Sequence, residues 1–145
     1  MAELRLERVF DAAPDRVFDA WVDPELLRRW WAAGPDWETP LAEADARPGG
    51  RYKLSMRNPE SGETHTVGGE YRQVERPNRL VYTWKWEDGD GTESLVTVDF
   101  AEAGEGTRVV LEHTGLGSDD SAAQHEHGWK ACMDNLERRA VLAAA

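Results

Sequence analysis

Two histidines and one glutamate are the residues of this chain best suited to acid–base or recognition chemistry. His113 ends a run of alternating apolar residues, and His125 begins the apolar face of a later helical segment. If both reach the same end of a pocket, His113 could orient a polar group or transfer a proton at a bound carbonyl or phenol. A hydrogen-bonded structural histidine near a sheet edge is the other interpretation. Glu70, expected near the pocket rim, is the second candidate for an orienting or catalytic group.

The remaining polar residues do not predict a metal or cofactor site. His125 and His127 are two residues apart, whereas two ligands on one helix need a spacing of three or four residues. His127 lies about 200° around the helix from Trp129, so we expect it to face water. The single Cys132 excludes a multi-cysteine site and reads as a small buried hydrophobe. Nucleophile-elbow, phosphate-loop and dinucleotide motifs are also missing, so we expect no cofactor.

Some charged residues share the parity of apolar neighbours. Glu43 and Asp45 share the parity of Leu41 and are predicted to point inward, as is Arg8 in the first strand. Unpaired buried charge is costly. We therefore expect buried ion pairs, either between Asp45 and Arg47 or between Arg8 and a glutamate.

Aromatic side chains are the main candidates for a binding surface. The chain has seven Trp, several of them in segments that should converge on one pocket. They favour either core filling or an aromatic slot for a flat or hydrophobic ligand. Trp37 lies in a loop and is the candidate for a mobile gate. The predicted ligand-binding residues are Trp30, Trp31, Tyr71, Trp84, Trp86, His113, Trp129 and Met133.

Helical periodicity identifies three elements that could position these groups. Pro14 opens a helix that Asp23-Pro24 breaks, and a second short helix spans residues 24–31 before Gly34-Pro35. The terminal segment can continue as helix to Ala145. At about 100° per residue it carries one apolar face. This face comprises His125, Trp129, Cys132, Met133, Leu136 and Ala140.

The region between these helices alternates with a period of two. Residues 3–11 form the first predicted strand, followed after the short helices by six more at 38–46, 51–57, 64–75, 79–87, 93–101 and 106–114. Turns rich in Gly and Pro separate them, which indicates antiparallel hairpins. One parity supplies a concave apolar face: Tyr52, Leu54, Met56, Val67, Gly69, Tyr71, Leu80, Tyr82, Trp84, Trp86, Val96, Val98, Phe100, Val109, Leu111 and His113. The opposite parity suits water, so the sheet has one wet face.

Length and charge limit the classes of function. A chain of 145 residues is most simply one domain, spanning residues 1–145. Its net charge of −11 argues against nucleic acid or an anionic membrane as partner. The first residues lack the basic start and apolar run of a signal peptide, and no later segment could span a membrane. We therefore expect a cytoplasmic protein.

The order of elements and several motifs resemble one known superfamily. The motifs are Arg8-Val9-Phe10-Asp11-Ala12-Ala13-Pro14, Val17-Phe18-Asp19-Ala20-Trp21, Asp23-Pro24-Glu25-Leu26, Arg29-Trp30-Trp31, Asp45 to Gly50, Gly69-Glu70-Tyr71, Val74 to Trp84, Thr107 to His113, Gly128-Trp129 and Met133 to Leu136. In order and spacing the chain is similar to the START-like (SRPBCC) superfamily. Within it, the chain resembles the group related to the C-terminal domain of activators of a heat-shock-protein ATPase (the AHSA type). The resemblance covers nearly the whole chain.

The resemblance implies an α+β helix-grip fold. In it a curved antiparallel sheet of about seven strands wraps around a long C-terminal helix, with two short helices after the first strand. It also implies a pocket between sheet and terminal helix. The superfamily includes lipid carriers, hormone receptors, aromatic-ring cyclases and chaperone regulators, the last linked to stress response, so fold alone does not fix activity.

Three functions remain open at this point. The favoured prediction is binding of a small hydrophobic or aromatic molecule in the pocket. The second is a polyketide cyclase- or hydrolase-like enzyme that uses the same pocket, with His113 as acid or base. The third is a module that regulates a chaperone or binds another protein; the chain lacks the separate N-terminal domain that the heat-shock-protein activators use. Exposed aromatics near the helix ends would also permit a homodimer.

Overall fold

The computed structural model describes residues 2–32, 34 and 36–138. Its elements, in chain order, are β1 (Glu3–Phe10), α1 (Pro14–Val22), α2 (Pro24–Trp30), β2 (Glu38–Ala44), β3 (Arg51–Arg57), β4 (Thr64–Glu75), β5 (Arg79–Trp86), β6 (Ser94–Ala103), β7 (Gly106–Thr114) and α3 (Asp119–Arg138). This order confirms the predicted α+β helix-grip fold. The helix predicted to reach Ala145 is observed as far as Arg138, and Ala140 lies outside the described residues.

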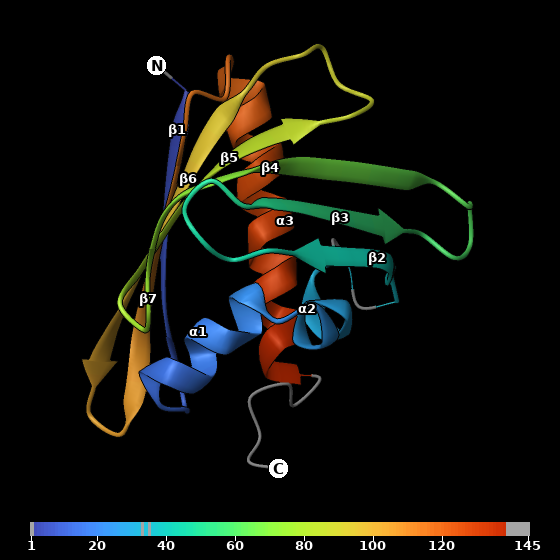
Figure 1. Cartoon of the computed structure of the whole chain (residues 1–145). Coiled ribbons are helices and arrows are strands. Elements are labelled where there is room, and N and C mark those ends of the chain that lie inside the picture. Colours follow the sequence, from blue (N-terminus) through green and yellow to red (C-terminus); the bar gives the residue numbers. More distant parts are fainter. Residues whose placement is uncertain (1, 33, 35, 139–145) are drawn as a thin grey trace.

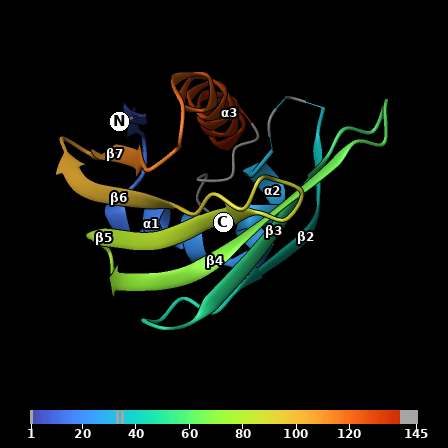
Figure 2. The same ribbon diagram turned by 90° about the horizontal axis from the view of Figure 1, so that it is seen from above.

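The seven strands form one antiparallel sheet in the order β1-β7-β6-β5-β4-β3-β2. Consecutive strands from β2 to β7 are joined by hairpins, whereas β1 and β2 lie at opposite edges. The segment containing α1 and α2 therefore passes from one edge of the sheet to the other (Figure 1). Seen from above, the sheet curves into an open trough with α3 lying over its concave side (Figure 2). Among the described residues, no helix is long and apolar enough to cross a membrane.

Local sequence signals set the two short helices. Pro14 stands in the first turn of α1, where its missing N–H costs no hydrogen bond. Asp23 then ends α1 and begins α2: its backbone N–H donates to Asp19 O at 2.8 Å, and its carboxylate accepts from the N–H of Glu25 at 3.0 Å. Pro24 follows in the first turn of α2. The predicted break at Asp23-Pro24 is therefore a capped junction between two helices.

The core lies between the concave face of the sheet and the helices. The predicted inward parity of β6 and β7 is confirmed, since Val96, Val98, Val109 and Leu111 are fully buried. From α3, the predicted stripe of Trp129, Cys132, Met133 and Leu136 is also buried against the sheet. Rings from α1, α2 and β6 fill one end of the trough, where Trp21 contacts both Trp30 and Phe100. This end is solid core, and the open space lies elsewhere.

The prediction that Glu43 and Asp45 point inward is wrong. The pairing of β2 with β3 shifts register between Glu38 and Leu41, so Ala42 takes the buried position and Glu43 is exposed. Asp45 does pair with Arg47, at 2.8 Å, but both side chains are more than half exposed at 56% and 73%. The pair therefore stays hydrated and avoids the desolvation that burial would impose.

Arg8 forms an ion pair across the edge of the sheet. Its guanidinium donates to Asp134 of α3 at 2.9 Å and lies 3.7 Å from Glu137. The Arg8 side chain is one quarter exposed, but those of Asp134 and Glu137 are 58% and 51% exposed. The prediction of a buried pair with a glutamate is therefore wrong: the shortest contact is with an aspartate, and both acidic partners stay hydrated. Arg8 ties β1 to the last turns of α3.

One glycine of β4 is required by close approach of the backbone. Gly69 pairs with Tyr52 of β3, whose hydroxyl donates to the carbonyl oxygen of Thr83 on β5. A Cβ atom added to Gly69 would lie 2.0 Å from that same oxygen. Only a residue without a side chain fits here.

Candidate functional site

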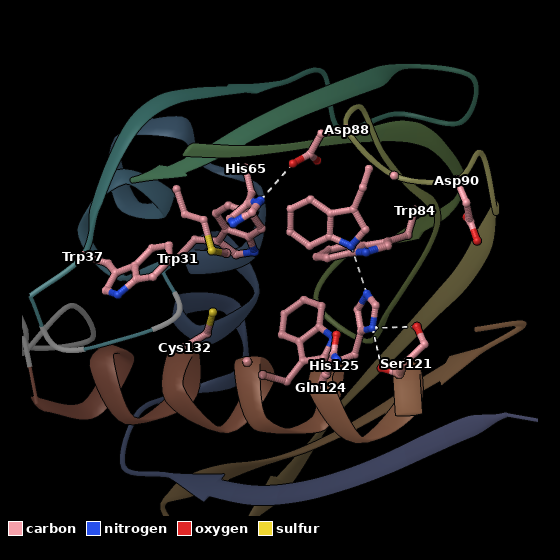
Figure 3. A pocket seen from close by; sticks show the side chains of 15 residues that line it. Trp31, Trp37, His65, Trp84, Asp88, Asp90, Ser121, Gln124, His125 and Cys132 are labelled. Carbon is pink, nitrogen blue, oxygen red and sulfur yellow. Dashed lines mark hydrogen bonds and ion pairs between the residues drawn. The ribbon is translucent and has the colours of Figure 1, made fainter. Parts of the chain in front are cut away.

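A cavity of about 600 Å³ opens between the sheet and the first half of α3. Its walls come from β3, β4, β5, the loop after α2, the loop after β5, and α3 (Figure 3). The lining residues are Trp31, Trp37, Met56, His65, Trp84, Trp86, Asp88, Gly89, Asp90, Ser121, Gln124, His125, Gly128, Trp129 and Cys132. Its size falls in the range of pockets that hold small organic ligands.

Four of the eight predicted ligand-binding residues line this cavity: Trp31, Trp84, Trp86 and Trp129. Trp84 is central among them, with ring contacts to Trp31, Trp86 and Trp129 at centroid separations of 6.1, 5.4 and 5.2 Å. The Trp84 indole nitrogen is buried and has no acceptor within the described part of the chain. Ring contacts therefore hold Trp84 in place.

The other predicted residues do not line the cavity. Trp30, the last residue of α2, is fully buried against α1, where its indole N–H donates to Ala20 O at 2.9 Å. Tyr71 packs in a cluster with Tyr52 and Tyr82, and Met133 is core. Burial raises the pKa of all three tyrosines, so their hydroxyls stay protonated.

Glu70 lies on the opposite side of the sheet from α3. It lines a separate charged groove together with Arg51, Lys53, Arg72 and Lys85. Alternation places it there, because its neighbours in β4 occupy the concave face. Glu70 is therefore not at the rim of the aromatic cavity.

His113 is fully buried directly behind the wall of the cavity. Its Nδ1 accepts from the indole N–H of Trp129 at 3.1 Å, which places the proton on Nε2. Nε2 then donates to Ser94 Oγ at 2.8 Å, and that hydroxyl donates to Trp84 O at 3.2 Å. Both ring nitrogens are thus occupied.

His125, which lines the cavity, also has a hydrogen-bond partner on each ring nitrogen. Its Nε2 accepts from the indole N–H of Trp86 at 2.9 Å, and its Nδ1 donates to Ser121 O at 2.7 Å. The rings of His113 and His125 lie 5.0 Å apart, so the two histidines do meet at one end of the pocket. Both serve as acceptors for tryptophan.

Burial keeps both imidazoles neutral. It lowers the pKa of His113 to about 3, with a further contribution from His125 nearby, and it also lowers the pKa of His125. A neutral imidazole can accept the indole N–H, whereas a protonated one cannot. Neither histidine keeps a free nitrogen for proton transfer to a ligand.

The mouth of the cavity carries the charged groups. Nδ1 of His65 lies 3.0 Å from Asp88 Oδ2, and Nε2 contacts Glu63. Partial burial acts to lower the pKa of His65, but the hydrogen bonds to Glu63 and Asp88 outweigh it and leave the pKa raised. Trp37, the predicted gate, stacks on His65 with ring centroids 6.4 Å apart. It lies at the rim (Figure 3).

Several residues of this site were not predicted from the sequence: His65, Asp88 and Asp90. His65 shares the parity of Val67 and Tyr71 in β4, so the alternation already contained the signal. Asp88 and Asp90 belong to the loop after β5, where no periodicity exists to place them. His127 is exposed, as expected. Among the described residues, no group of three His, Cys, Asp or Glu side chains is arranged to hold a metal ion.

The loop after α2 is fastened to α3 by two buried side chains. Asn135 Nδ2 lies 3.4, 3.2 and 3.1 Å from the carbonyl oxygens of Trp30, Ala32 and Gly34. Cys132 Sγ contacts Ala32 O at 3.2 Å. Because this loop carries Trp31 and Trp37, these contacts position one wall of the cavity.

The fold and the cavity beneath α3 define a START-like helix-grip domain. The family model described as "Activator of Hsp90 ATPase homolog 1-like protein" matches residues 11–140. The chain therefore belongs to the AHSA1-like family. No curated protein matches the sequence.

Solved structures agree with this assignment. A protein from Chromobacterium violaceum is 28% identical with a TM-score of 0.86, over 95% of this chain and 96% of that one. The AHSA1 protein from Silicibacter pomeroyi is 33% identical with a TM-score of 0.85, over 99% and 100% of the two chains. An AHSA1-like protein from Aeromonas hydrophila is 28% identical with a TM-score of 0.74, over 94% and 92%.

Proposed function

We propose that this domain binds a small hydrophobic or aromatic molecule in the cavity between the sheet and α3. The observation that carries the proposal is the cavity itself, about 600 Å³ and walled largely by tryptophan. Indole rings give a large apolar contact area, and few polar groups interrupt the wall.

Gly128 supports the proposal independently. It lies in the middle of α3, where glycine destabilises a helix by about 1 kcal/mol relative to alanine. A Cβ atom at this position would meet no neighbouring atom within 4 Å, so packing does not require glycine. The missing side chain leaves open space at the floor of the cavity, which is what a bound molecule would need.

The same position provides the test. Truncating Trp129 to alanine would weaken binding, but it would also leave His113 without its indole partner. Gly128→Phe instead adds a ring into open space. Ala123→Phe adds the same ring on the exposed side of the same helix and serves as the matched control.

Each protein is titrated with the uncharged fluorescent probe N-phenyl-1-naphthylamine. We expect saturable binding to the wild type and to Ala123→Phe, and at least about tenfold weaker binding to Gly128→Phe, equivalent to about 1.4 kcal/mol. Equal affinity for all three folded proteins would mean that the probe binds elsewhere and would count against the proposal.

A further inference from the structure

The charged side chains of the cavity have one predominant sign. Asp88 and Asp90 line the mouth, and no lysine or arginine belongs to the described lining. His65 is the one lining group with a raised pKa, but Asp88 and Glu63 flank it on both nitrogens. Even when His65 is protonated, the mouth keeps an excess of negative charge.

Asp90 is the second carboxylate of the lining. Hydrogen bonds from the hydroxyl and backbone N–H of Thr92 lower its pKa, so Asp90 is ionised at neutral pH. Unlike Asp88, it forms no ion pair within the described ranges of the chain. Its charge is therefore uncompensated by a neighbouring cation.

The aromatic wall favours positive charge as well. A tryptophan ring face attracts a cation more strongly than any other side-chain ring, through the negative potential of its π system. The indole N–H groups of Trp86 and Trp129 donate to His125 and His113, so these polar edges are used within the wall. A ligand that carries an anion would find no lysine or arginine in the described lining, and neither of these two donors is free for it.

The field of the whole chain acts in the same direction. A net charge of −11 attracts small cations and repels small anions at long range. The mouth is open to water, so an ammonium group placed there keeps part of its hydration and avoids the cost of full burial.

We infer that the ligand of this cavity is an organic cation: an amine whose apolar part packs among the tryptophans and whose ammonium group lies at the mouth beside Asp88 and Asp90. The inference rests on the proposed function and names the chemical class of its ligand. It favours an amine over a fatty acid or another organic anion of equal size.

The test uses three probes that share one ring system: 2-naphthylmethylamine, 2-naphthalenemethanol and 2-naphthoate, which at pH 7 are cationic, neutral and anionic. Isothermal titration of the full chain should give at least about tenfold tighter binding of the amine than of the alcohol, and weakest binding of the acid. The preference for the amine should also fall as salt is added, because screening weakens attraction between charges.

Two double variants locate the effect. Asp88→Asn with Asp90→Asn should abolish the preference for the amine while the affinity for the alcohol stays within about twofold. Glu102→Gln with Glu105→Gln changes the net charge equally in the β6–β7 hairpin and should preserve the preference. Loss of alcohol binding in Gly128→Phe shows that the probes occupy the cavity.

The outcomes separate the two claims. Equal binding of amine and alcohol, or tighter binding of naphthoate, would overturn the inference about charge and leave the binding function intact. Failure of all three probes to bind the wild type would overturn both. An amine preference that survives in the Asp88/Asp90 double variant would also contradict the inference, since these carboxylates would then not be its source.

Discussion

Replacement of Asn135 by leucine should destabilise the protein and loosen one wall of the cavity. The Asn135 side chain is fully buried, and its amide nitrogen faces the carbonyl oxygens of Trp30, Ala32 and Gly34. Leucine has a similar shape and no donor. The substitution therefore removes the hydrogen bonds while keeping most of the packing.

The magnitude follows from the number of donors. An amide NH₂ group has two hydrogens, so it can form two strong hydrogen bonds among the three acceptors. Each lost bond costs about 1 kcal/mol net, and a buried carbonyl left without a partner costs about 1–3 kcal/mol. We expect the free energy of unfolding to fall by about 2–4 kcal/mol. For a domain of this size the loss lowers Tm by at least about 4 °C.

Urea denaturation followed by circular dichroism measures this loss. His127→Leu provides the matched control, because it makes the same kind of change at an exposed position of the same helix. The control should stay within about 0.5 kcal/mol of the wild type. A loss below about 1 kcal/mol for Asn135→Leu, or a loss equal to that of the control, would refute the reasoning. The variant should also bind N-phenyl-1-naphthylamine more weakly, because the loop that carries Trp31 is less firmly held.

Three further outcomes can be measured on the same protein. Gly69→Ala should lower the free energy of unfolding by at least about 2 kcal/mol in urea, because its Cβ would lie 2.0 Å from Thr83 O; a neutral effect would mean that the strand can shift freely. Gly128→Ala should raise Tm by about 2–4 °C in calorimetry, because it restores about 1 kcal/mol of helix propensity without a clash; a lower Tm would contradict the open space at this site. The pKa of His113 is about 3 in the fold and about 6.5 when unfolded, so the unfolded chain binds the proton first and stability should fall as the pH drops from about 6.5 towards 3. His113→Gln should flatten this part of the curve of unfolding free energy against pH, and an unchanged slope would assign the effect to other groups.

Alternation and helical periodicity were sufficient to predict the sheet and its long helix. Val96, Val98 and Phe100 occupy every second position of β6, and burial of one parity follows directly from the geometry of a strand. Trp129 and Met133 are four residues apart and therefore share one face of α3. Such patterns depend only on the local geometry of strands and helices, so they can be recognised directly in the sequence.

The positions of individual tryptophan rings could not be predicted from the periodicity of the sequence. Trp30 and Trp31 are adjacent, yet only Trp31 reaches the cavity. Trp31 follows the last residue of α2 and its φ of −76° is still close to helical, so its side chain points about 100° around the helix axis from that of Trp30. This rotation directs Trp30 towards Ala20 and Trp31 into the cavity. The sequence predicted the end of the helix within one residue but did not distinguish these two adjacent rings.

The hydrogen-bond partners of buried polar side chains could not be predicted from the sequence, for a different reason. Trp129 and His113 are sixteen residues apart, and Trp86 and His125 are thirty-nine apart. Such pairs form only when curvature of the sheet and the position of α3 are both fixed. No local pattern encodes either quantity. The prediction that His113 is a satisfied hydrogen-bonding residue was one of two open alternatives, and the geometry favours it.

These indole–imidazole pairs also bear on how an apolar cavity can stay open. Large rings beside empty space would gain contacts by rotating into it, since unfilled volume forfeits dispersion energy. Trp86 and Trp129 are prevented from doing so, because rotation would break their hydrogen bonds to His125 and His113 and leave buried polar atoms unpaired. The two histidines thus keep the tryptophan rings of the cavity wall in position. A positively charged group on the ligand finds carboxylates only at the mouth of the described lining, where Asp88 and Asp90 lie, and this is the physical reason why the charge of the ligand is the property to test.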